Sequence, residues 1–324
     1  MNPLKWLFIN QLKHSRLKQK FGGFTLLELL VGMILAFLII TPLMGLMINI
    51  MASDRQEQAK TNTEQEIKGA LDYIARDLQQ AVYIYDDDGI AAIRQQLPKY
   101  DEKDNYFPVL VFWKRHFIPG GLTVTGGSDD TFVYALVAYY MIKDNNSAWS
   151  GAARIGRFQI SGGYGASQTD RDNTRDSGFQ LFELKDSGDL KTKMNRWTKK
   201  SGETYDQQIL PLVDYIDQTP IDSSTNQRPT CPDTSDPDTS YKLVPKYTGT
   251  GDAVATGNVN TRGFYVCVLA NNANNVAAEV YLRGNALARL QNNNLNFSQN
   301  RESQRSYFPQ ASISVKGRGF LFTE

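Results

Sequence analysis

Histidine is almost absent from this sequence, since the 324 residues contain only His14 and His116. A Ser/His/Asp or Cys/His mechanism would have to use His116, and neither cysteine has the neighbours of a nucleophile. We expect His116 to be half-exposed on a strand. The glycine-rich segment 161–165 lacks the Lys-Ser/Thr ending of a phosphate-binding loop. We therefore predict no catalytic residue and no cofactor, and we interpret the protein as a non-enzyme.

Cysteine is equally scarce, with Cys231 and Cys267 alone. Two cysteines and one histidine outside the first 23 residues do not readily supply a zinc site. We predict a disulfide between the two cysteines, which requires an oxidising compartment; the alternative is two unrelated buried thiols. The acidic runs at 86–88 and 233–238 lack the EF-hand spacing, so we predict solvated turns and no metal site.

Acidic residues are missing from segment 1–23. Its charged residues are all basic: Lys5, Lys13, Arg16, Lys18 and Lys20. Without this segment the formal charge changes from +1 to −4, because 30 basic and 34 acidic residues remain. The basic segment directly precedes an apolar run, where positive charge fixes membrane orientation. We therefore expect contact with a lipid bilayer and no binding of nucleic acid.

The apolar run covers residues 24–48, and its about 25 residues are enough to cross a bilayer as a helix. A secretory signal peptide has a shorter apolar core followed by a small-residue cleavage site, which the segment 50–52 matches poorly. A plain anchor leaves Glu28, the one charged residue of the run, unexplained. An acidic residue costs about 2.5 to 3.5 kcal/mol at mid-membrane, so Glu28 is expected to have a function.

The residues Gly22-Gly23-Phe24-Thr25-Leu26-Leu27-Glu28, behind a basic leader, resemble the processing site of type IV prepilins and type II secretion pseudopilins. The resemblance implies that a prepilin peptidase cuts between Gly23 and Phe24 on the cytoplasmic side and that Phe24 is N-methylated. It also implies a single-pass protein of the inner membrane whose head faces the periplasm or, in a filament, the cell surface. Its partners would be other pilins or pseudopilins and an inner-membrane assembly platform.

The chemistry of this junction can be argued without the family. Cleavage creates an α-amino cation in low dielectric, and Glu28 of the same or a neighbouring subunit can neutralise it as an assembly contact. Gly23 lacks a Cβ, which lets a protease approach the backbone closely. Pro42 and Gly45 predict a weak point in the helix, although membrane helices also tolerate proline without such a role.

An amphipathic stretch follows the apolar run. Apolar residues recur every three or four positions from Ile67 to Tyr85, which predicts that one helix of about 60 residues continues to 85 and ends at Asp86-Asp87-Asp88-Gly89. We divide the chain into a leader (1–23), a transmembrane half-helix (24–51), an amphipathic half-helix (52–85) and a head (86–324).

The head is predicted to be rich in β-strands. Short β-branched and aromatic runs predict strands at 107–113, 131–142, 154–160, 179–184, 264–270, 277–283 and 311–315. We expect an α+β fold with one antiparallel sheet on the exposed half of the helix, and a hairpin between 264–269 and 278–283. The polar stretch 186–262 is predicted to form long loops.

The C-terminal segment 280–289, Val-Tyr-Leu-Arg-Gly-Asn-Ala-Leu-Ala-Arg, is similar to pseudopilins of cyanobacterial hormogonium polysaccharide secretion. The main hypothesis is thus a minor pilin or pseudopilin that primes or joins a filament for polysaccharide secretion and gliding motility. A minor component of type II secretion or of a type IV pilus is the alternative. A further alternative is a membrane-tethered adhesin or sugar-binding module, which would not need Glu28.

Overall fold

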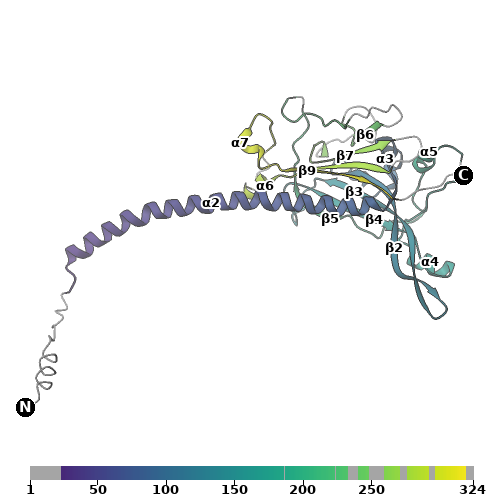
Figure 1. The fold of residues 1–324 in the computed structure, drawn as a ribbon, viewed down its shortest axis with the longest axis horizontal. Helices are drawn as coiled ribbons and strands as arrows, with labels where there is room; N and C mark the ends of the chain where they lie inside the picture. Colours follow the sequence, from purple (N-terminus) through teal and green to yellow (C-terminus); the bar gives the residue numbers. More distant parts are fainter. Residues whose placement is uncertain are drawn as a thin grey trace, which may run out of the picture. The chain divides into compact units, whose positions relative to one another are not determined.

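The structure is a computed structural model that describes residues 23–185, 187–222, 224–232, 240–247, 259–270, 276–291 and 296–318. The chain divides into two compact units, Met1–Asp54 and Arg55–Glu324. Figure 1 shows the elements of both units.

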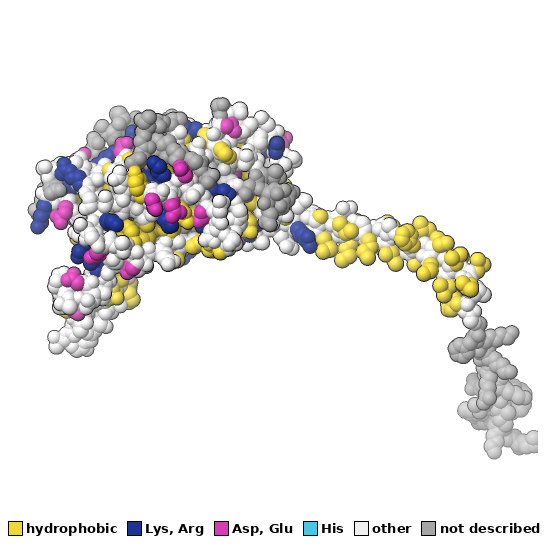
Figure 2. Space-filling view, turned by 180° about the vertical axis from the view of Figure 1, so that it is seen from behind, with side chains coloured by type: hydrophobic (Ala, Val, Ile, Leu, Met, Phe, Trp, Pro, Cys, Tyr) yellow, Lys and Arg dark blue, Asp and Glu magenta, His cyan; other side chains and the backbone are white. Residues whose placement is uncertain are grey.

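The first unit contains the start of a long helix, α2 (Leu26–Gln79). Every residue from Gly23 to Gln58 is exposed, and hydrophobic side chains gather along this stretch of the helix (Figure 2). Within the described residues, α2 is the one helix long and apolar enough to cross a membrane. An apolar helix surface without protein cover is what a lipid-facing segment requires, so single-pass anchoring fits this unit.

The second unit begins with the remainder of α2, one face of which is buried. Buried residues recur at helical spacing along this face: Ala59, Thr63, Ile67, Ala70, Leu71, Ile74, Ala75, Asp77 and Leu78. This confirms the amphipathic helix, but the expected end at 85 is wrong because α2 ends at Gln79. Residues Ala81–Ile84 form strand β1, in which every side chain is buried. A short apolar run that is buried on both faces cannot be assigned to helix or strand by periodicity.

The acidic run after β1 starts a helix and does not end one. Asp86 caps the N-terminus of α3 (Asp87–Ile93), because its side chain accepts a hydrogen bond from the Gly89 amide. The short helices that follow are η1 (Arg94–Gln96), η2 (Tyr100–Glu102), α4 (Gln168–Thr174), α5 (Leu190–Asn195), α6 (Ala286–Gln291) and α7 (Glu302–Arg305).

The first sheet has five antiparallel strands in chain order: β1, β2 (Tyr106–Val124), β3 (Gly127–Ile142), β4 (Ala153–Ser161) and β5 (Leu210–Ile216). Pairing with β1 stops at Lys114 of β2, and pairing with β4 stops at Ala135 of β3. Beyond these residues the β2–β3 hairpin continues as a two-stranded ribbon that extends past the rest of the sheet (Figure 1).

The second sheet has four antiparallel strands: β6 (Ser240–Val244), β7 (Phe264–Ala270), β8 (Ala277–Arg283) and β9 (Gln310–Lys316). The predicted hairpin is confirmed, since β7 and β8 pair from Phe264 with Leu282 to Leu269 with Ala277. Val266, Val268 and Val280 point from this sheet into the main hydrophobic core, which also includes the buried face of α2.

Three expectations for the head are wrong. The structure has two antiparallel sheets instead of one. Segment 179–184 is not a strand. Instead, Phe179 and Phe182 pack edge-on against Trp113, and their ring centroids lie 5.8 and 5.0 Å, respectively, from the Trp113 centroid. The stretch 186–262 contains α5, β5 and β6 besides loops. Both strands are short and form sheet edges, where proline and charged residues are tolerated and weaken the strand pattern in the sequence.

A buried ion-pair cluster joins the end of α2 to the first sheet. The Asp77 carboxylate accepts three hydrogen bonds, each 2.7 Å long. The donors are Lys114 Nζ on β2, Arg157 Nε on β4 and the Tyr139 hydroxyl on β3. Burial alone raises the pKa of Asp77, but the charges of Arg157 and Lys114 outweigh it and hold the pKa below its ordinary value. The helix is therefore fixed to three strands by one carboxylate.

The other end of the buried stretch of α2 is covered by residues of segments 284–291 and 296–307. An added Cβ at Gly284 would collide with Thr63 and Ile67, so this glycine is required for close approach to the helix. Arg289 Nε donates to Thr63 Oγ1 at 3.0 Å, and the Tyr307 hydroxyl donates to Gln56 Oε1 at 2.9 Å.

Candidate functional site

The predicted processing and assembly residues lie within the first turn of α2. Thr25 Oγ1 accepts a hydrogen bond from the Glu28 amide at 3.3 Å and caps the helix directly before Leu26. Phe24, 82% exposed, precedes this cap. Glu28 lies in the first helical turn, where a carboxylate interacts favourably with the helix dipole.

Thr25 is a functional candidate that the sequence analysis did not identify. Its spacing to Glu28 is that of the capping box, Ser or Thr followed three residues later by Glu, which places a helix start at this point. The cap places the Gly23–Phe24 junction outside the helix. This position suits cleavage, because a protease needs an extended backbone.

The helix continues through both residues of the predicted weak point. Pro42 and Gly45 are inside α2, and an added Cβ at Gly45 would meet nothing within 4 Å. Pro42 has no amide hydrogen for the carbonyl four residues earlier. Next to it, Thr41 Oγ1 donates to the Phe37 carbonyl at 2.8 Å, a contact that often bends helices. The weak point stays a prediction.

The predicted disulfide is confirmed: Cys231 and Cys267 are bonded, with Cα atoms 5.6 Å apart. The alternative of two unrelated thiols is therefore wrong. Cys267 lies on β7 between Val266 and Val268, which face the core, so its side chain lies on the outer face of the second sheet. The bond attaches the segment before Cys231 to this face.

We expect the Cys231→Ser/Cys267→Ser double variant to lose about 3 to 4 kcal/mol of unfolding free energy, because the bond closes a loop across 36 residues. Urea unfolding of the full chain with and without reductant measures this difference. The double variant provides the control, since reductant should not change its unfolding. An unchanged midpoint for the reduced native protein would contradict the prediction.

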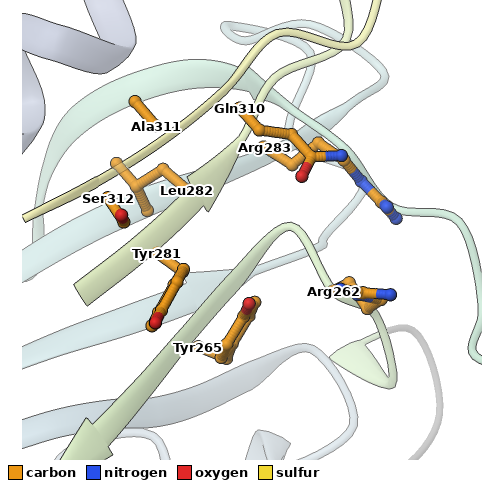
Figure 3. A pocket seen from close by; sticks show the side chains of 8 residues that line it. All are labelled: Arg262, Tyr265, Tyr281, Leu282, Arg283, Gln310, Ala311 and Ser312. Carbon is orange, nitrogen blue, oxygen red and sulfur yellow. The ribbon is translucent and has the colours of Figure 1, made fainter. Parts of the chain in front are cut away.

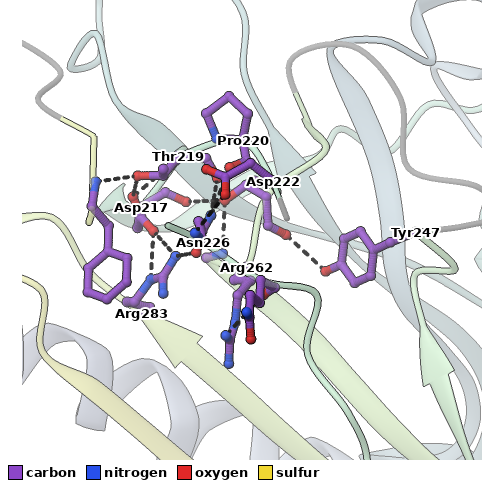
Figure 4. Close-up of polar contacts among 12 residues, drawn as sticks. Asp217, Thr219, Pro220, Asp222, Asn226, Tyr247, Arg262 and Arg283 are labelled. Atoms are coloured by element: carbon purple, nitrogen blue, oxygen red, sulfur yellow. Dashed lines mark hydrogen bonds and ion pairs between the residues drawn. The ribbon is translucent and has the colours of Figure 1, made fainter. Parts of the chain in front are cut away.

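A polar network lies where this attached segment meets the end of β8 (Figure 4). Arg283, 3% exposed, donates from Nε to Asp217 Oδ2 at 2.6 Å and from Nη2 to Asn226 Oδ1 at 2.7 Å. Thr219 Oγ1 donates to Asp217 Oδ1 at 2.6 Å, and Asn226 Nδ2 donates to the Thr219 carbonyl at 2.8 Å. Gly263 must be a glycine here, because an added Cβ would overlap the Asp217 carbonyl oxygen. The network fixes a buried guanidinium at the outer face of the sheet.

The acidic run 86–88 is not the solvated turn that we predicted, since Asp86 and Asp87 are buried. The three carboxylates lie close together. Lys191 Nζ lies 2.6 Å from Asp86 Oδ2 and 3.3 Å from Asp88 Oδ2, so a cation of the chain already pairs with the cluster. Burial, followed by the charges of Asp88 and Asp86, raises the pKa of Asp87. The other acidic run, 233–238, lies outside the described residues.

His116 is half-buried on β2, as expected for a strand histidine. Burial and the nearby charges of Lys114 and Arg157 lower its pKa. This environment favours the neutral imidazole at neutral pH.

Comparison of this chain with protein-family models, with curated proteins and with solved structures finds no match.

Proposed function

We propose that this protein is a minor pilin or pseudopilin that assembles through α2 into a type IV pilus-like filament. The observation that carries the proposal is Glu28, a lone carboxylate in the first turn of a helix whose apolar half is exposed on all sides. A membrane anchor needs the apolar surface but not the carboxylate. A subunit that packs its helix beside others in low dielectric needs a counter-charge for a new N-terminal amine.

Gly23 supports processing at this junction. An added Cβ at Gly23 would meet nothing within 4 Å, so the fold itself does not require glycine there. A requirement at this position would come from a protease that approaches the backbone. We propose prepilin peptidase as the partner, with N-methylation of Phe24 after the cut, insertion in the inner membrane and the head in the periplasm.

The exported substrate that we favour is a polysaccharide, with gliding motility as the dependent activity. The resemblance of segment 280–289 supports this choice over type II protein secretion, and the structure assigns three roles to this segment. Arg283 joins the polar network, Gly284 contacts α2 and Arg289 bonds to Thr63. A tethered sugar-binding module is the second candidate, and Glu28 discriminates between the two.

We expect mass spectrometry of the membrane-extracted protein to find methyl-Phe24 at the N-terminus. Gly23→Leu should accumulate the uncut chain, because the added side chain blocks approach to the backbone. Gly45→Leu is the matched control: it changes another exposed glycine of the same segment and should be cut normally. An intact Met1 or a cut near Ala52 in the native protein would exclude the pilin proposal.

A further inference from the structure

A pocket of about 270 Å³ opens on the outer face of the second sheet (Figure 3). It is lined by Arg262, Tyr265, Tyr281, Leu282, Arg283, Gln310, Ala311 and Ser312. Strand register explains why these residues meet: Tyr281 is opposite Tyr265 on one side and Ser312 on the other, and Arg283 is opposite Gln310. The volume is just below the about 300 to 1,000 Å³ of sites for drug-sized ligands, so it suits one small unit.

The charged groups that line the pocket are both cations. Arg283 is fixed from behind by Asp217, whose two carboxylate oxygens are already bonded to Arg283 and Thr219. Arg262 Nη1 donates to the Gln227 carbonyl at 3.0 Å, a contact that leaves its charge unneutralised. Glu279, on the same face, accepts a hydrogen bond from the Tyr281 hydroxyl, and it is opposite Ser314, one row away from Ser312. Arg283 is paired with Asp217, so Arg262 is the cation of the lining that has no carboxylate partner among the described residues, and it can receive an anionic group.

The rest of the wall is not typical of a site for a simple anion. The rings of Tyr265 and Tyr281 are stacked, with centroids 4.6 Å apart and planes 6° apart, and they provide the apolar surface. The side chains of Leu282 and Ala311 point to the core, so these two residues line the pocket with backbone. Gln310 and Ser312 are exposed and offer neutral hydrogen-bonding groups. A ligand that uses all three kinds of surface has a negative charge, an apolar face and several hydroxyl groups.

We propose that this pocket binds an acidic sugar unit of a polysaccharide, with the sugar carboxylate at Arg262 and Arg283 and the ring against the tyrosine pair. Gln310 and Ser312 would bond to the sugar hydroxyls. The inference depends on the proposed function only for the source of the saccharide, which would be the exported polymer.

Saturation-transfer NMR on the full chain in detergent micelles, with galacturonate, galactose and acetate as probes, tests the proposal. Galacturonate should bind saturably, and galactose and acetate should each bind about tenfold more weakly or less, since each lacks one set of contacts. Arg262→Gln removes a cation, and Ser312→Phe fills the pocket from an exposed edge position while keeping both cations. Both variants should lose galacturonate binding, whereas Arg305→Gln, a change of an exposed arginine on α7, should retain it.

Equal binding of galactose would overturn the acidic class, and equal binding of acetate would leave a general carboxylate site and overturn the sugar. Binding that survives in Ser312→Phe, or no binding of galacturonate at all, would remove the site itself. The Glu28→Gln protein should bind galacturonate as the native protein does. Loss of galacturonate binding and loss of filament assembly can thus be told apart.

Discussion

Replacement of Glu28 by glutamine is expected to abolish incorporation of the protein into filaments while membrane insertion and cleavage stay intact. Glutamine preserves size and hydrogen bonding and removes the charge alone. The amine of a processed Phe24 would then lack its partner in low dielectric, and loss of one member of a buried ion pair costs about 3 to 5 kcal/mol. That cost corresponds to a decrease of about 100-fold or more in the assembly equilibrium.

Complementation of a deletion strain, scored for cleaved protein in membranes, for filament-incorporated protein and for motility or polysaccharide release, measures the effect. Glu28→Leu should be no better than Glu28→Gln, because added apolarity does not replace the counter-charge. Glu57→Gln is the matched control, since Glu57 is an exposed carboxylate of the same helix that lies beyond the apolar run. Full function with Glu28→Leu would favour the tethered module.

The second large effect is expected at Asp77, which joins α2 to three strands. Asp77→Asn should destabilise the head by about 3 to 5 kcal/mol, because it leaves Lys114 and Arg157 close together without a counter-charge. Thermal unfolding of the full chain in detergent, followed by circular dichroism, measures the change. Asp72→Asn, at an exposed acid five residues earlier on the same helix, should change the unfolding temperature little. Equal stability of the two variants would contradict the role of the cluster.

The same carboxylate gives the head a pH dependence of known sign. The native pKa of Asp77 lies below its ordinary value of 3.8, so the unfolded chain binds the proton more readily. The stabilisation is therefore fully present well above 3.8 and declines as the pH falls toward the lower native pKa. Asp77→Asn should flatten the acid side of the stability profile. An acid profile identical to that of the native protein would contradict this assignment.

The parts of the fold that sequence predicted are those with a clear period or a clear local signal. The stripe of α2 repeats every three or four residues, and the β7–β8 hairpin has two runs of β-branched and aromatic residues around an asparagine-rich turn. Cys231 and Cys267 were predicted to be paired from their number, the shortage of further zinc ligands and an expected oxidising compartment. The helix stripe and the hairpin depend on neighbours in the chain, so local physics suffices to detect them.

The parts that sequence missed depend on distant partners. Strand β1 is buried on both faces, so its sequence shows no alternation of apolar and polar residues. Phe179 does not lie in a strand, and its ring packs against Trp113. The tyrosine pocket is also non-local, since strand register decides which of its side chains meet. Tyr265 and Tyr281 could have been paired from the predicted hairpin, but nothing local indicates that Arg262 and Gln310 join them.

The contacts of Arg289 and Tyr307 with α2 impose an order on biogenesis. Tyr307 is 251 residues away from Gln56, its partner on the helix, and Arg289 is 226 residues away from Thr63. At about 5 to 20 residues per second, a ribosome needs on the order of 10 to 50 s to make the intervening chain. During that time the apolar stripe of α2 is exposed to other nascent chains. We therefore expect a holdase chaperone to bind this stripe until translation of the C-terminal segment is complete.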